Sequence, residues 1–177
     1  MQNIFSTSER IKIIEKIIFR EDNLSVNDIA SKVGLSKGLV SKYFDMLRRE
    51  GILIRKNGMF FVRNSAFTKA IKILLNIKKA SLQKFKKYPF IKSAGLYGSC
   101  AKGENNEDSD IDLWVRVEKT KDEKLAAFTS ELRKKIPKAK ILLLTDDKIE
   151  QMKKEDVMFY HALTFGTIIL FGDKVGI

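Results

Sequence analysis

The segment LYGSCAKGENNEDSDIDLWV, residues 96–115, limits what this chain can fold into more than any other part of it. Apolar runs at 91–97 and 111–117 overlap its two ends and have the length of buried strands. Side chains alternate between the two faces of a strand, so Asp110 and Asp112 project from one face. The segment therefore predicts two neighbouring carboxylates beside the turn Gly98-Ser99. The plainer alternative is an ordinary turn next to an acidic loop.

The rest of the second half alternates strands with helices. The pattern predicts a loop with a helix start at 98–108, a helix at 122–135 and a strand at 139–145. Further helical turns and a last apolar segment at 167–171 follow. Such alternation indicates an α/β or α+β layer.

The first half begins with three predicted helices. Isoleucines at helical spacing predict the first over residues 8–20. Ser25 is expected to cap a short helix that ends at Gly34, and Ser36 to cap another that ends at Gly51. A three-residue turn thus separates the second helix from the third.

A hairpin is predicted after these helices. The short apolar segments 52–54 and 59–62 are joined through Asn57-Gly58, a dipeptide that accepts the positive φ angles of a tight hairpin. Helix, helix, turn, helix and hairpin is the order of elements in a winged helix.

The net charge of +12 is unevenly distributed along the 177 residues. Residues 1–64 carry 12 basic and 7 acidic side chains, residues 65–92 carry 8 and none, and residues 93–177 carry 14 and 15. Clustered positive charge gains affinity for nucleic acid by releasing counterions. The distribution predicts a polyanion partner for the first half; a merely solubilising surface is the alternative.

We therefore expect an α+β chain of two domains joined by a basic helix. The predicted boundaries are 1–64 for a winged helix-turn-helix, 65–90 for the connecting helical region and 91–177 for a mixed sheet flanked by helices. Ser65 is expected to cap the connecting helix, which the pattern extends to about residue 88.

Composition makes several other classes improbable. One cysteine and one histidine are too few for a disulfide or a structural zinc site. No apolar run reaches the roughly 18 to 20 residues that span a bilayer, and the first ten residues lack a secretory h-region. The expectation is a cytoplasmic protein with no membrane partner.

Residues 6–63 resemble the winged helix-turn-helix of prokaryotic transcription regulators, with core positions such as Ala30, Val40 and Phe44 in DIASKVGLSKGLVSKYFDMLRREGIL. The resemblance implies that the start of the second helix of the motif enters the major groove of DNA. Winged helices also serve as protein-protein modules, which is the alternative. The candidate DNA-binding residues are Ser36, Lys37, Ser41 and Lys42 on that helix, Arg48 and Arg49 at its end, and Arg55 and Lys56 on the hairpin.

Residues 79–172 resemble the minimal nucleotidyltransferases of the DNA polymerase β superfamily. The match consists of a hydrophobic strand, Gly-Ser, a glycine four residues after that serine, Ser-Asp-x-Asp and a second hydrophobic strand. The resemblance implies that Asp110 and Asp112 are catalytic and hold Mg²⁺ or Mn²⁺. It also implies that Gly98, Ser99 and Gly103 approach the phosphates of a nucleoside triphosphate.

The sequence departs from this family at one position. Such enzymes usually carry a third carboxylate on the next core strand, but the predicted strand Ala139-Lys140-Ile141-Leu142-Leu143-Leu144 has none. Lys140 aligns nearest to the missing group, and Asp146 or Asp147 at the end of the strand is a candidate substitute. Lys140 is either a fixed cation that binds phosphate, which makes it a nucleotide-binding candidate, or an exposed lysine at the strand edge.

Three other residues have a structural and a functional interpretation. Cys100 is either a small filler or a thiol acidified by the helix start. Trp114 is a core residue or stacks on a base. His161 lies in an apolar helical pattern and is interpreted as packed or partly exposed rather than catalytic.

Two functions remain open. The first is an enzyme that transfers a nucleoside monophosphate from a triphosphate to a hydroxyl acceptor. Family relatives with the same ten-residue gap, here 100–109, include antitoxins that modify a small helical partner, so a protein acceptor is one hypothesis beside a small molecule or an RNA end. The second is a DNA-binding regulator, with homodimers a further hypothesis, whose degenerate domain senses nucleotide or docks a partner without catalysis.

Overall fold

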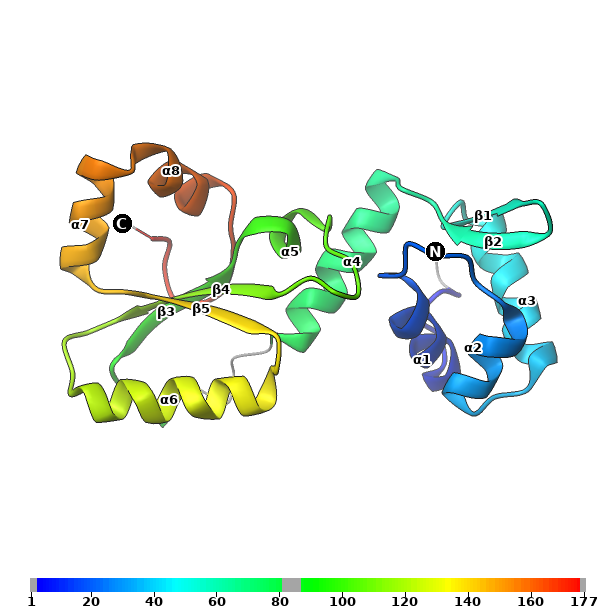
Figure 1. Cartoon of the computed structure of the whole chain (residues 1–177), viewed down its shortest axis with the longest axis horizontal. Coiled ribbons are helices and arrows are strands. Elements are labelled where there is room, and N and C mark those ends of the chain that lie inside the picture. The colour runs from blue at the N-terminus through cyan, green and yellow to red at the C-terminus, as the bar shows by residue number, and fades with distance from the viewer. Residues whose placement is uncertain (1–2, 81–86, 176–177) are drawn as a thin grey trace. The chain divides into compact units, whose positions relative to one another are not determined.

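The computed structural model describes residues 3–80 and 87–175, and its fold is α+β, as the sequence predicts. The chain divides into two compact units, Met1–Lys72 and Ile73–Ile177. The first contains helices and a two-stranded hairpin, and the second contains a four-stranded mixed sheet with helices on its faces (Figure 1). Among the described residues, no helix combines the length and the apolar character that crossing a bilayer requires.

Unit 1 starts with the three predicted helices: α1 (Ser8–Ile17), α2 (Val26–Val33) and α3 (Lys37–Arg49). The side chains of Ser25 and Ser36 accept hydrogen bonds from the amides of Asp28 and Leu39, so both act as the N-caps that were predicted. Gly34 ends α2 in the left-handed conformation, with φ of 67°. The core between these helices consists of buried side chains including Ile13, Ile14, Ile17, Val40, Phe44 and Leu47.

The hairpin consists of β1 (Leu53–Lys56) and β2 (Met59–Val62), which pair antiparallel. Asn57 and Gly58 both have positive φ, of 48° and 79°, and this conformation gives the strands their tight two-residue connection. Phe60 of β2 packs edge-on against Phe44 of α3 and attaches the hairpin to the helices. The winged-helix order is thereby confirmed.

The connecting helix, α4 (Ala66–Lys79), begins with the predicted Ser65 cap, whose hydroxyl accepts from the amide of Thr68. It ends earlier than the sequence pattern suggested, and residues 81–86 of the predicted helix lie outside the described residues. The boundary between the two units falls within α4.

Unit 2 contains β3 (Ile91–Leu96), α5 (Gly98–Lys102), β4 (Ile111–Val117), α6 (Asp122–Lys135), β5 (Ala139–Leu144), α7 (Asp146–Glu155), α8 (Val157–Phe165) and β6 (Ile168–Phe171). The sheet order is β5-β4-β3-β6. Strands β4 and β5 are parallel and are joined through α6, whereas β3 is antiparallel to both of its neighbours. The three predicted strands of this half are present, and the last apolar segment forms a fourth strand, β6.

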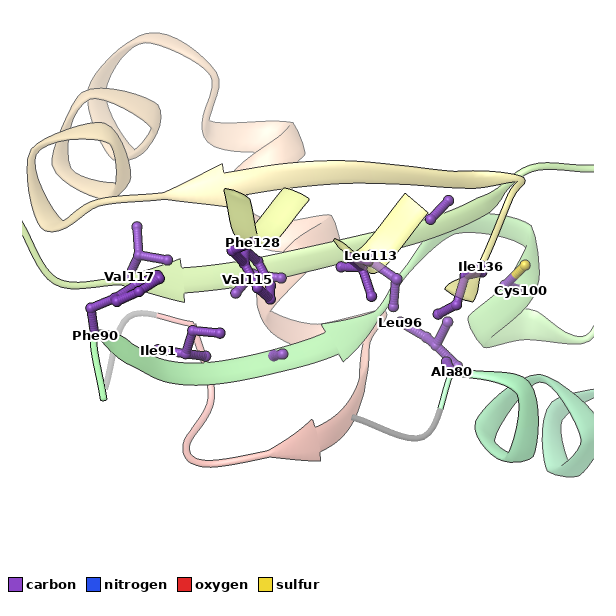
Figure 2. Packing of buried hydrophobic residues seen from close by; sticks show 13 residues of the cluster. Ala80, Phe90, Ile91, Leu96, Cys100, Leu113, Val115, Val117, Phe128 and Ile136 are labelled. Carbon is purple, nitrogen blue, oxygen red and sulfur yellow. The ribbon is translucent and has the colours of Figure 1, made fainter. Parts of the chain in front are cut away.

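Each face of this sheet has its own core. Leu113, Val115 and Val117 of β4 pack with Phe128 of α6 on one face (Figure 2). Trp114, from the alternate face of β4, packs with side chains of α7 and α8. This alternation follows from the two-residue period of a strand, and it places Asp112 on the same face as Trp114.

Candidate nucleotide site and nucleic-acid interface

The candidate site lies where β3 ends, α5 begins and β4 starts. Gly98 opens α5 with φ of 64°, a conformation that favours glycine. A Cβ built on Gly98 would lie 2.7 Å from Oδ2 of Asp112, so the absence of a side chain lets this carboxylate approach the turn. Ser99 follows on the half-buried first turn of α5. The predicted Gly-Ser turn and Asp112 are therefore brought together.

Gly103 ends α5 in the left-handed conformation, with φ of 67°, and its amide donates to the carbonyl of Ser99. This glycine is buried. In the structure Gly103 caps a five-residue helix. Its contact with phosphate stays a prediction.

Lys140 lies directly opposite Asp112 in the parallel pairing of β5 with β4. Its Nζ is 2.6 Å from Oδ2 of Asp110, with the two side chains 68% and 43% exposed. The strand register therefore places Lys140 beside the two aspartates, and its alignment with the family's third carboxylate stays a prediction. The site combines two carboxylates with an ammonium group.

Burial raises the pKa of Asp112 above its ordinary value, the Lys140 ammonium opposes this shift, and the Asp110 carboxylate adds to it. The hydrogen bond to Asp110 raises the pKa of Lys140, so this side chain stays protonated at neutral pH. Tyr97, at the end of β3, faces the same charges: burial and then Asp112 raise its pKa, and Lys140 lowers it.

A pair of buried amides supports the loop between α5 and β4. Nδ2 of Asn76, on α4, donates to the carbonyl of Cys100 and to Oδ1 of Asn105, each at 2.9 Å, and Asn105 Nδ2 donates back at 3.2 Å. Both residues are buried, with exposures of 0% and 4%. Sequence reasoning missed them; the available signal was a polar residue, Asn76, within the apolar stripe of α4.

The end of the same loop is held by Asn106. Its Oδ1 accepts from the amides of Asp108 and Ser109, each at 3.0 Å, and its own amide donates to the Ser109 hydroxyl. Asn side chains commonly close turns in this way. The bonds fix the backbone immediately before Asp110.

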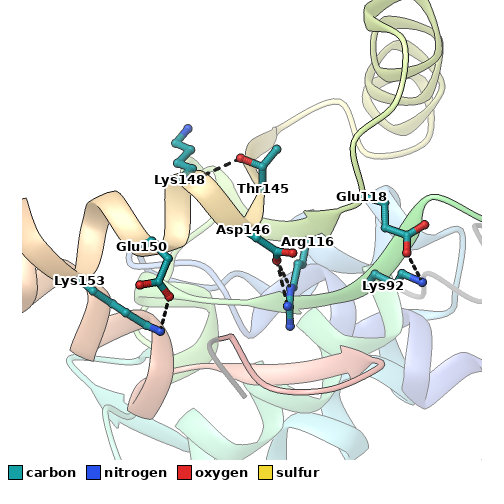
Figure 3. Close-up of polar contacts among 8 residues, drawn as sticks. All are labelled: Lys92, Arg116, Glu118, Thr145, Asp146, Lys148, Glu150 and Lys153. Carbon is teal, nitrogen blue, oxygen red and sulfur yellow. Dashed lines mark hydrogen bonds and ion pairs between the residues drawn. The ribbon is translucent and has the colours of Figure 1, made fainter.

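Asp146 and Asp147 do not substitute for the third carboxylate. Asp110 and Asp112 stand at the start of β4, whereas Asp146 follows the end of the parallel strand β5. Asp146 instead pairs with Arg116, whose Nη2 is 2.9 Å from its Oδ1 (Figure 3). Because parallel strands run in one direction, the length of β5 separates this carboxylate from the candidate site.

Asp110, Asp112 and Lys140 do not fit a centre of two metal ions. Among residues 3–80 and 87–175, no group of three or more His, Cys, Asp or Glu side chains is arranged to hold a metal ion. The third side chain at the site carries a positive charge, and divalent cations such as Mg²⁺ prefer oxygen ligands.

The structure decides two of the open interpretations. Cys100 is fully buried, donates its S–H to the carbonyl of Asp110, and has a pKa raised by burial, which contradicts an acidified thiol. Trp114 is also fully buried, and its indole N–H donates to Thr167, so it does not stack on a base. His161 is exposed and stacks on Phe165.

The candidate DNA-binding residues of unit 1 are all exposed. Ser36 caps α3, and Lys37, Ser41 and Lys42 lie in its first two turns. Nε of Arg55 donates to the carbonyl of Gly58, and its guanidinium lies over the ring of Phe60 at 5.5 Å. The others in the set are Arg48 and Arg49, at the end of α3, and Lys56, at the end of β1.

Comparison with known proteins agrees with both parts of the fold. Residues 10–54 match the model of a winged helix-turn-helix DNA-binding domain, and residues 74–164 match that of a nucleotidyltransferase domain. A crystal structure from Sulfolobus solfataricus, described as a "putative nucleotidyltransferase", is similar with a TM-score of 0.41 and 14% identity over 60% of this chain and 88% of that one. No curated protein gave a significant match.

Members of the nucleotidyltransferase family generally use divalent metal ions and nucleoside triphosphates. The family match spans half of this chain and includes the Gly98 turn, both aspartates and Lys140. The chain belongs to the nucleotidyltransferase domain family and carries a winged helix-turn-helix DNA-binding domain before it.

Proposed function

We propose that this protein is a DNA-binding regulator whose nucleotidyltransferase domain binds a nucleoside triphosphate without transferring it. The observation that carries the proposal is the position of Lys140. It lies opposite Asp112 and forms a 2.6 Å ion pair with Asp110, where the family usually has its third carboxylate. In this proposal the winged helix binds DNA through its exposed basic residues. The protein then acts in the cytoplasm.

The retained half of the site supports nucleotide binding. The turn at Gly98 keeps a close approach between backbone and Asp112, and the amide network of Asn76 and Asn105 holds the loop that follows. Preorganised backbone donors in a glycine turn suit an anionic ligand. We expect the ligand to be a nucleoside triphosphate.

The altered half of the site argues against transfer. A nucleotidyl transfer needs the attacking hydroxyl to lose its proton, which a carboxylate base accepts and a protonated ammonium cannot. Lys140 is held protonated by Asp110, so it offers no base at this position. We therefore expect that a lysine in place of the third carboxylate keeps nucleotide binding and removes much of the transfer activity.

Two measurements on the full chain test this function. Isothermal titration with each nucleoside triphosphate in magnesium measures binding, and incubation with α-labelled triphosphate plus protein, RNA and small-molecule acceptors measures transfer. We expect binding of nucleoside triphosphate and no transferred label. Label transfer abolished by both Asp110→Ala and Asp112→Ala would overturn the proposal.

That outcome would establish the second candidate, a nucleotidyltransferase acting on a hydroxyl acceptor. One observation favours it: both aspartates are retained, Asp112 on β4 beside the Gly98 turn and Asp110 directly before that strand. Lys140→Ala separates the two candidates further. In an active enzyme with Lys140 in its site, this change alters the transfer rate, whereas it creates no transfer activity in a binding protein.

A further inference from the structure

We propose that Lys140 is a built-in cation of the nucleotide site, which lets this protein bind a nucleoside triphosphate without any divalent metal ion. The inference rests on the proposed nucleotide binding and goes beyond it, because it assigns to one side chain the charge that metal ions supply elsewhere in the family. It also accounts for the mismatch between the residues present and a two-metal centre.

The geometry places the ammonium among the groups that a metal would contact. Strand register sets Lys140 opposite Asp112, and its Nζ lies 2.6 Å from Asp110 Oδ2. An ammonium has three N–H donors, and the bond to Asp110 uses one of them. With 68% of its side chain exposed, Lys140 can direct the others to phosphate oxygens.

The charges lead to the same conclusion. Three carboxylates would give the site a charge of about −3, and a triphosphate could approach only with metal ions between them. Asp110, Asp112 and Lys140 together carry about −1 when ionised. The ammonium therefore reduces the repulsion that makes metal obligatory.

Another lysine of the same sheet forms a comparable ion pair away from the candidate site. Lys92 of β3 forms a similar exposed pair, 2.5 Å from Glu118, at the opposite end of β4 (Figure 3). Lys92 and Lys140 have similar exposures, 52% and 68%, but only Lys140 lies in register with Asp112, the carboxylate beside the Gly98 turn. Lys92 is therefore the matched control.

The experiment measures binding of ATP to the full chain by equilibrium dialysis, in magnesium and in excess EDTA. For the wild type we expect the two dissociation constants to agree within about threefold. Lys140→Met should weaken binding in EDTA by about tenfold or more, the loss expected for one hydrogen bond to a charged group. Lys92→Met should leave both constants unchanged.

A third variant tests the exchange of ammonium for metal directly. Lys140→Asp restores three carboxylates, so it should bind ATP only with magnesium. Its affinity for Mn²⁺ in the absence of nucleotide, read by electron paramagnetic resonance, should exceed that of the wild type by about tenfold or more. Emission of the buried Trp114 verifies that each variant is folded.

Different outcomes of this experiment would overturn the inference and the proposed function. Wild-type binding that requires magnesium, with Lys140→Met equal to the wild type, overturns the inference and leaves nucleotide binding intact. Tighter ATP binding by Lys140→Met also overturns it, since Lys140 would then obstruct the site. No binding of any triphosphate in either condition overturns the proposed function itself.

Discussion

Individual residues at the candidate site show which local features the chemistry needs. Gly98 combines a positive φ with a close approach to a carboxylate, and both features favour glycine. Lys140 of β5 forms an ion pair with Asp110, which directly precedes β4, so this contact depends on the pairing of the two strands. Asn76 places an amide in an otherwise apolar helix stripe, where it is fully buried.

The substitution Gly98→Ala should lower both stability and nucleotide affinity. A left-handed conformation costs a non-glycine residue about 1–3 kcal/mol, and here the new Cβ would also press on Asp112 Oδ2. Gly34→Ala is the matched control, because φ is 67° there but nothing lies within 4 Å of the added atom. Nucleotide titration should show weaker binding for Gly98→Ala alone. Equal affinities would contradict a role for this turn.

Asn76→Leu should destabilise unit 2 by about 2–3 kcal/mol, because the Asn105 side chain and the Cys100 carbonyl, both inside the protein, lose the hydrogen bonds that Asn76 makes to them. Urea unfolding followed by Trp114 emission measures the change. In the double variant Asn76→Leu with Asn105→Leu, both buried amides are gone, and the loss should be smaller than the sum of the single losses. Strict additivity would show that the two amides are not coupled.

The bounds of several helices and strands can be compared with those that the sequence predicts. The helix at 122–135 and the strand at 111–117 have the bounds that the sequence predicts, because their periodicities and flanking residues are local signals. Elements also differ from expectation: α4 ends at Lys79, and β1 runs from Leu53 to Lys56. Contacts between elements, such as those of Glu131, are invisible to these local patterns.

Glu131 of α6 should make stability depend on acid pH. Hydrogen bonds from Lys135, Lys87 and Tyr88 lower the pKa of this carboxyl from 4.5 to about 2. The stabilisation is therefore present above pH 4.5 and is lost as pH falls towards about 2. Glu131→Gln should lower the urea midpoint at pH 7 and have no effect near pH 2. An equal effect of Glu131→Gln at pH 7 and near pH 2 would contradict this pH dependence.

Helix α3 should carry DNA binding that weakens steeply with salt. Replacing one phosphate-contacting cation lowers the slope of log affinity against log salt concentration by about 0.9. We expect this change for Lys42→Ala in fluorescence anisotropy with duplex DNA. Lys32→Ala is the control, since that ammonium bonds to Asp28 at 2.9 Å on α2. An affinity that does not vary with salt would favour a protein-protein role for the winged helix.

At the scale of the whole molecule, charge and chemistry are divided between two compact units. Residues 1–64 have an excess of basic side chains, whereas residues 93–177 are close to neutral. The exposed candidate DNA-binding residues belong to unit 1, and the Gly98 turn with Asp110, Asp112 and Lys140 belongs to unit 2. Each unit has its own buried core.

This division predicts that substitutions at the nucleotide site leave DNA affinity unchanged when nucleotide is absent. Asp112→Asn and Lys140→Met should each keep the dissociation constant for duplex DNA within about twofold of the wild type, since these residues belong to a different compact unit from the candidate DNA-binding residues. Fluorescence anisotropy at fixed salt measures the constant. A change of tenfold in either variant would indicate energetic coupling between the two units.

Local sequence patterns were enough to predict the α+β class, the winged-helix order, the caps at Ser25 and Ser36, the Asn57-Gly58 hairpin and the closeness of the Gly98 turn to Asp112. These features depend on periodicity and on interactions between residues a few positions apart, which a contiguous sequence displays. The tertiary structure decided that Lys140 binds Asp110, that Asp146 instead pairs with Arg116, and that Asn76 reaches Asn105. The members of each pair are about 30 residues apart in the chain. They meet only because strand register and packing on both faces of the sheet bring them together.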